Sequence, residues 1–71
     1  MFIVTHEVCE NFNTTRIGKR KLFLRLFDAV RYAERESGVE AVEFPYGYIC
    51  HRKSNYKCEN GQHEIYRIER S

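Results

Sequence analysis

Two segments near the start of the chain alternate between hydrophobic and polar positions. In residues 2–9, one face of an extended chain would carry Phe2, Val4, His6 and Val8. Residues 19–24 alternate in the same way. Because successive side chains of a strand point to opposite faces, both segments are predicted to be β-strands. Asn and Thr are concentrated between them in residues 10–15, and Gly18 follows, so we expect a loop that joins two antiparallel strands.

The hydrophobic period changes at Leu26, which predicts a helix over residues 26–37. Leu26, Ala29, Val30 and Ala33 are spaced so that they gather on one helical face. Asp28 favours the positive end of the helix dipole, and Gly38 can adopt the left-handed conformation that ends helices. Since an isolated helix of about 12 residues is marginal in water, it must pack against a sheet.

The second half of the chain has the pattern of further strands. Residues 39–44 and 48–50 are predicted to be strands, separated by a turn at Pro45 and Gly47. Asn60-Gly61 is the favoured central pair of a type I′ turn, which predicts a hairpin between residues 56–58 and 63–68. The element order is therefore β-β-α-β-β-β.

This order predicts an α+β domain with a curled four- to five-stranded antiparallel sheet and one helix packed on one face. The expected core residues are Leu22, Leu24, Leu26, Ala29, Val30, Ala33, Val4, Val42 and either Ile65 or Ile68. One helix covers only one face of such a sheet, so the opposite face must be solvated or occupied by a partner. We expect function to reside there.

Length and composition restrict the chain to one soluble domain, residues 1–71. Its hydrophobic fraction of 42% supplies a core that disordered chains lack. No apolar stretch approaches the roughly 20 residues needed to span a bilayer, and no secretory signal begins the chain. We therefore expect a cytoplasmic protein whose three cysteines, Cys9, Cys50 and Cys58, are free thiols, because an odd number cannot form a closed disulfide framework.

The cysteines and histidines raise the question of a metal site or a catalytic centre. His6, Cys9, Cys50, His51, Cys58 and His63 include enough ligands for zinc. However, His6 and Cys9, like Cys50 and His51, lie on predicted strands where the two members of each pair point to opposite faces. A domain of this size also has little room for a catalytic pocket, and no glycine-rich phosphate-binding motif is present. We predict no enzyme activity, no metal site and no cofactor, with a structural zinc domain as a weaker alternative.

Charge is distributed unevenly, although the net charge is only +2. Between Glu10 and Asp28 there is no acidic residue and there are five basic ones. Basic side chains can neutralise phosphates or meet acidic surfaces, and aromatic ones can stack on bases or pack on a partner. Lysines also occur on exposed strand edges simply to prevent aggregation, so a solvated edge remains an alternative. The candidate binding residues are Arg16, Lys19, Arg20 and Lys21, with Tyr46, Tyr48, Arg52 and Lys53 as a second set.

The tyrosines are expected in two environments. Tyr32 and Tyr66 are predicted to pack at the edge of the core, whereas Tyr46 and Tyr48 flank the predicted turn and should be exposed. Tyrosine is common at protein interfaces because it combines area, rigidity and a hydroxyl group.

The first half of the chain resembles the compact accessory proteins of bacteriophages. The strand Phe2-Ile-Val-Thr-His-Glu-Val, the Asn-rich loop to Gly18 and the helix Leu26-x-x-Ala29-Val30-x-x-Ala33 are similar in layout to the small type I-F anti-CRISPR proteins. This resemblance implies a phage protein that docks on a host nucleoprotein complex in the host cell cytoplasm and blocks its access to DNA, without a cofactor. By position, Arg16, Lys19, Arg20 and Lys21 would meet the target.

The leading hypothesis is therefore a non-enzymatic inhibitor, a monomer or a homodimer, that binds a host protein or nucleoprotein complex. The alternative is a small basic module that binds DNA or RNA directly.

Overall fold

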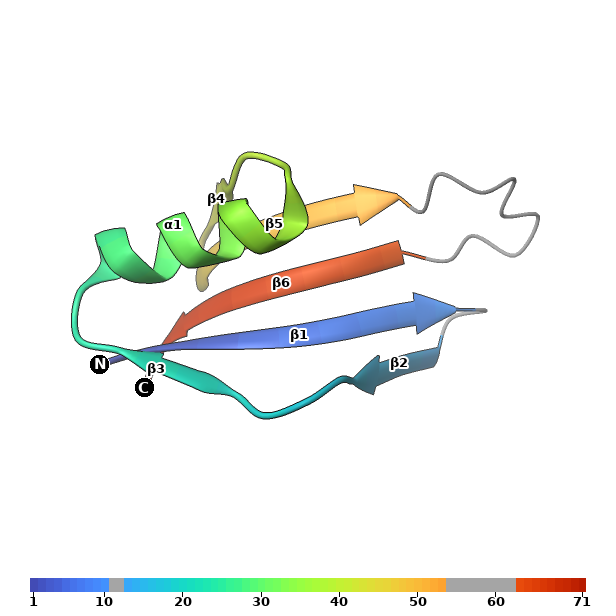
Figure 1. Ribbon diagram of the computed structural model, residues 1–71, viewed down its shortest axis with the longest axis horizontal. Helices are drawn as coiled ribbons and strands as arrows, with labels where there is room; N and C mark the ends of the chain where they lie inside the picture. Colours follow the sequence, from blue (N-terminus) through green and yellow to red (C-terminus); the bar gives the residue numbers. More distant parts are fainter. Residues whose placement is uncertain (11–12, 54–62) are drawn as a thin grey trace.

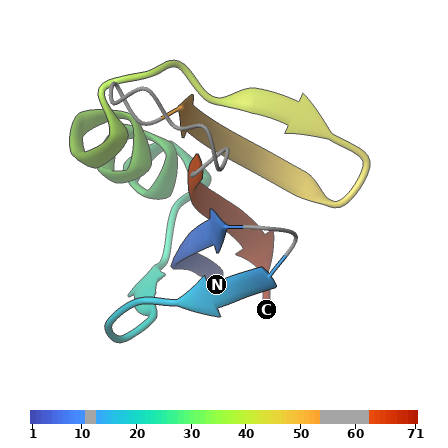
Figure 2. The same ribbon diagram turned by 90° about the vertical axis from the view of Figure 1, so that its right-hand side faces the viewer.

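The computed structural model describes residues 1–10, 13–53 and 63–71, which form an α+β domain. The elements are β1 (Phe2–Glu10), β2 (Asn13–Arg16), β3 (Lys21–Phe23), α1 (Leu26–Ser37), β4 (Val42–Phe44), β5 (Gly47–Lys53) and β6 (His63–Arg70). The helix lies against one side of a curled antiparallel sheet (Figures 1 and 2). The predicted fold class is confirmed. No helix in these described ranges is long and apolar enough to cross a bilayer.

The sheet has six strands, with five in the order β2-β1-β6-β5-β4. The remaining strand, β3, pairs with β1 on the same edge as β2, further along β1 (Figure 1). All the pairs are antiparallel. β2 was not predicted, because Asn and Thr indicated a loop. Its residues instead form a ladder along the edge of β1, with Thr14 opposite Cys9 and Arg16 opposite Glu7.

The other predicted elements differ from the observed ones mainly in length. α1 has the predicted bounds, and it ends at Gly38, whose left-handed φ of 76° lets its N–H donate to the carbonyl of Glu34. β3 and β4 are shorter than the predicted strands, whereas β5 and β6 are longer. The predicted strand at residues 56–58 and the Asn60-Gly61 turn lie outside the described residues.

The core lies between α1 and the sheet. Its buried hydrophobic residues are Val4, Ala29, Ala33, Cys50, Tyr66 and Ile68. Four of these, Val4, Ala29, Ala33 and Ile68, were predicted, and the predicted Leu26 and Val30 are partly buried against them. Tyr32 also packs at the core edge, as predicted.

The prediction of the core is wrong at three residues, because they lie away from the helix. Leu22, Leu24 and Val42 are 61%, 80% and 57% exposed. Leu22 is opposite Ile3 and Val42 is opposite Ile49, on the face that α1 does not cover. Leu24 lies in the connection between β3 and α1. Cys50 and Tyr66 occupy the core beside Ile68 instead.

Candidate interaction surface

The two faces of the sheet differ because side chains alternate along each strand. Val4, Tyr66 and Ile68 point toward α1, and so does His6, whose ring stacks on Tyr66 with 4.2 Å between centroids. The intervening residues form the opposite face, which we call the helix-free face. It includes Ile3 and Glu7 of β1, Arg67 and Glu69 of β6, and Ile49 of β5.

A row of charged groups occupies the centre of the helix-free face. Arg67 donates to Oε1 of Glu7 from Nη2 at 3.1 Å and from Nε at 3.2 Å. Its Nε also lies 3.7 Å from Oε1 of Glu69. One guanidinium therefore lies between two carboxylates, and this row separates the β2–β3 side of the face from the β4–β5 side.

Three of the predicted binding residues come together on the β2–β3 side. Arg16, Lys19 and Arg20 are exposed and lie around Ile3 and Leu22, and together we call these five residues the basic margin. They line a shallow hollow of about 500 Å³, and Arg16 and Arg20 also line a neighbouring hollow of about 330 Å³. Within the part of the chain that the structure describes, none of the three cations has an ion-pair partner. Their charge is therefore available to an incoming anionic group.

Lys21 does not belong to this margin. It is opposite Val4 in the ladder between β3 and β1, which places it on the same face as α1. Its Nζ lies 5.1 Å from the centroid of the Tyr32 ring, within range of a cation–π interaction. The structure thus separates Lys21 from the three cations that the sequence grouped with it.

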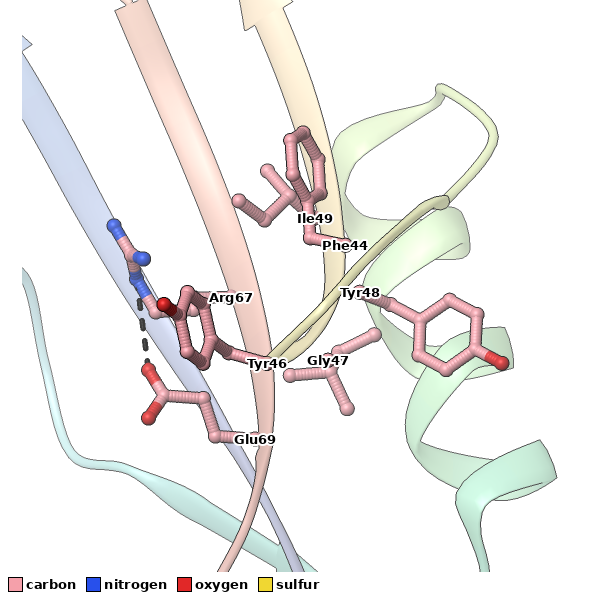
Figure 3. A pocket seen from close by; sticks show the side chains of 8 residues that line it. Phe44, Tyr46, Gly47, Tyr48, Ile49, Arg67 and Glu69 are labelled. Carbon is pink, nitrogen blue, oxygen red and sulfur yellow. Dashed lines mark ion pairs between the residues drawn. The ribbon is translucent and has the colours of Figure 1, made fainter.

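The β4–β5 side carries an aromatic hollow of about 370 Å³ (Figure 3). Tyr46 is 89% exposed and lies over Arg67 and Glu69 at one end, and Phe44 and Ile49 lie at the other. Tyr48 points from the same hairpin toward the side of α1. The predicted exposure of Tyr46 is confirmed. Tyr48 was also predicted to be exposed, but it is partly buried against the core because its ladder position is on the helix side.

Tyr48 is held by Glu43. Its hydroxyl donates to Oε2 of Glu43 at 2.9 Å, and this hydrogen bond, together with the carboxylate charge, raises the pKa of Tyr48. Tyr46 and Tyr48 both line the aromatic hollow, but their rings point to different sides of the hairpin. Arg52 and Lys53 lie in β5, and their side chains are outside the part that the structure describes.

A pair of histidines lies on the helix-free face toward the end of β5 and the start of β6. Nε2 of His51 is 2.7 Å from Nδ1 of His63, and the two rings stack with 4.8 Å between centroids. The sequence did not predict this pair, because the strand that it indicated covers only residues 48–50 and does not reach His51. The register of β5 on β6 is the feature that brings the rings together.

The described part of the chain contains two free thiols, Cys9 and Cys50. In residues 1–10, 13–53 and 63–71, no group of three or more His, Cys, Asp or Glu is arranged to hold a metal ion. Burial raises the pKa of the Cys50 thiol, the direction opposite to that needed in a nucleophile. Cys50 is also fully buried, so no substrate reaches it in this conformation.

The predicted binding residues thus fall into separate locations. Arg16, Lys19 and Arg20 share the basic margin, Tyr46 lies across the charged row from them, and Lys21 and Tyr48 lie on the helix side. No family model, curated protein or solved structure matches this chain.

Proposed function

We propose that this chain is a non-enzymatic binding protein whose basic margin docks on an acidic surface of a partner protein. The observation that carries the proposal is the grouping of Arg16, Lys19 and Arg20 around two apolar side chains, without ion-pair partners among the described residues. Apolar residues at the centre of an interface supply buried area, and charges around them select a partner and speed its association. Leu22 is well placed for this role, since it is 61% exposed at the margin.

Two features favour a protein partner over a nucleic acid. Ile3 and Leu22 lie among the cations of the basic margin, and apolar side chains of this kind supply buried area against a protein rather than contacts to phosphates. Among the described residues, no aromatic side chain lines either hollow of the basic margin, so the ring on which a base would stack is not supplied beside these cations. Direct DNA or RNA binding by the basic margin remains the alternative.

The resemblance of the first half of the chain to small type I-F anti-CRISPR proteins would make the partner a host protein or nucleoprotein complex. The chain would then act in the host cytoplasm by occupying a surface that the complex needs. An acidic protein surface of such a complex fits the charge and the apolar centre of the basic margin.

The test compares two variants with equal changes in charge. The first carries Arg16→Ala, Lys19→Ala and Arg20→Ala, which remove the cations of the basic margin. The control carries Arg25→Ala, Arg31→Ala and Arg35→Ala, which remove three exposed cations at and near α1. Each exposed substitution should change stability by about 0.5 kcal/mol or less, so both variants should remain folded.

Each protein is used to capture partners from host lysate, with and without nuclease, and association rates are measured with the partner that the parent captures. We expect capture that resists nuclease, an association rate at least tenfold lower for the margin variant, and a smaller difference at high salt. Equal binding by the margin variant and the parent would contradict the proposal. Loss of capture after nuclease, with a salt slope reduced by about one per lost phosphate contact, would support the nucleic-acid alternative instead.

A further inference from the structure

His51 and His63 bring two imidazole nitrogens together on the helix-free face. His51 lies on β5 opposite Ile65, and His63 lies on β6 opposite Lys53, so the two histidines are diagonal neighbours on paired strands. Their nitrogens, Nε2 and Nδ1, are 2.7 Å apart, and their rings are inclined by 26°. Because both residues belong to the same hydrogen-bonded ladder, the sheet already holds the two rings together.

The contact between the two rings has a chemical consequence. A hydrogen bond between two imidazole nitrogens needs one N–H donor and one lone pair, so at least one of the contacting nitrogens carries no proton. An unprotonated ring nitrogen is the atom that binds transition metals. Two nitrogens bound to one ion at about 2.0–2.1 Å would be about 3 Å apart, so the separation changes little, but each ring must turn its lone pair away from the other nitrogen and toward the ion.

We propose that His51 and His63 form a two-histidine site for a divalent transition-metal ion. Imidazole nitrogen suits Zn²⁺, Ni²⁺, Co²⁺ and Cu²⁺, whereas Ca²⁺ and Mg²⁺ require oxygen ligands. The described residues place no group of three such ligands together, so the site that they define has two protein ligands.

Cys9 is the third soft group near this position. It is opposite His63 in the ladder between β1 and β6, and its side chain is partly buried. A thiol can bind the same ions as an imidazole, so the test must separate the two kinds of ligand. His6 provides the matched control, because it lies on the other face and its Nε2 is 2.9 Å from Oε1 of Glu64.

The experiment measures binding of Zn²⁺ and Ni²⁺ by calorimetry in a Cys9→Ser, Cys58→Ser background under reducing conditions. Cys50 is kept, since it is fully buried. We expect one ion per chain, affinity reduced at least tenfold by His51→Ala and by His63→Ala, unchanged affinity in His6→Gln, and no measurable binding of Ca²⁺. Circular dichroism checks that each variant is folded.

Spectroscopy on the parent chain gives a readout that does not depend on the variants. Titration with paramagnetic Co²⁺ should broaden the NMR signals of His51, His63 and Ile65 before those of His6 and the residues of α1. The proposal would be overturned if the His51→Ala and His63→Ala variants bound the ions as tightly as the protein that keeps both histidines. Loss of binding in the thiol-substituted background, or broadening that begins elsewhere, would also overturn it.

Discussion

The guanidinium of Arg67 joins β6 to β1 by donating to Glu7, with Nη2 3.1 Å from Oε1. The Glu7 side chain is 19% exposed and the Arg67 side chain is 38% exposed. The pair lies at the centre of the helix-free face, between the basic margin and the aromatic hollow. The charges of this pair therefore cancel at the centre of the helix-free face, whereas the cations of the basic margin lie to one side of it.

The ion pair should contribute modestly to stability, because water still reaches part of it. In a double-mutant cycle with Glu7→Gln and Arg67→Met, we expect an interaction free energy of about 0.5–1 kcal/mol from urea unfolding. The matched cycle with Glu69→Gln should give a smaller value, since Glu69 lies 3.7 Å from Arg67 and is more exposed. A larger interaction for Glu69 than for Glu7 would contradict the geometry.

Ala33 should not tolerate a charged side chain. It is fully buried against the sheet, so Ala33→Glu forces a carboxylate into the core without a partner. We expect a loss of about 2–5 kcal/mol in the free energy of unfolding. Arg31→Glu introduces the same group on the exposed face of the same helix, and it should change stability by about 0.5 kcal/mol or less. Equal melting midpoints for the two variants would show that the buried face of α1 is assigned incorrectly.

Among the glycines that the structure describes, Gly47 should be the most sensitive to substitution. Its φ is +151°, and an added Cβ would meet the main-chain carbonyl oxygen of Ile68 on the neighbouring strand. Gly38 also has a positive φ, of +76°, but open space surrounds its Cβ position. We expect Gly38→Ala to cost about 1–2 kcal/mol and Gly47→Ala at least twice as much, measured by chemical denaturation. A smaller cost at Gly47 would mean that β5 and β6 separate readily at this point.

Stability should fall at alkaline pH because of Cys50. Burial raises the pKa of its thiol above the ordinary value of 9.0, so the folded chain keeps the proton at a pH where the unfolded chain releases it. The contribution of the neutral thiol is complete below pH 9.0 and decreases as the pH rises toward the folded pKa. Urea unfolding between pH 8 and pH 10.5 should show this decline, because the unfolded chain releases roughly one proton from Cys50 that the folded chain keeps. The slope should be smaller in Cys50→Ala, and an unchanged slope would assign the decline to other groups.

The fold should not depend on a metal ion. The core consists of apolar side chains between α1 and the sheet, and no described residues form a closed metal site. We therefore expect the thermal midpoint to be the same with and without excess EDTA. Loss of the transition in EDTA and its recovery with zinc would favour the structural zinc alternative. A two-histidine site at His51 and His63 lies outside this core, so it is compatible with an unchanged midpoint.

The chain's local patterns determined the identity of most elements. The spacing of Leu26, Ala29, Val30 and Ala33, followed by Gly38, was sufficient to define α1, because helix periodicity and capping act over a few neighbouring residues. Alternation likewise identified β1 and the segments that became β3 and β4, and turn residues bounded the segments that became β5 and β6. The sequence also shows directly that five basic residues lie in one stretch of the chain without an acidic residue.

The tertiary structure decided which side of each strand faces the helix. Alternation divides a strand into two faces, but strand pairing and the position of α1 select the buried one. Leu22 therefore became exposed opposite Ile3, and Lys21 was separated from Arg20. The edge of β1 likewise made a strand of residues whose composition is typical of a loop.

The candidate sites depended on the same long-range pairing. Arg16, Lys19 and Arg20 are close in sequence, but their position around Ile3 follows from the pairing of β2 and β3 with β1. His51 and His63 are 12 residues apart and meet only because β5 and β6 are in a particular register. Local propensity specifies the elements of this chain, and backbone hydrogen bonds between distant segments specify which side chains share a surface.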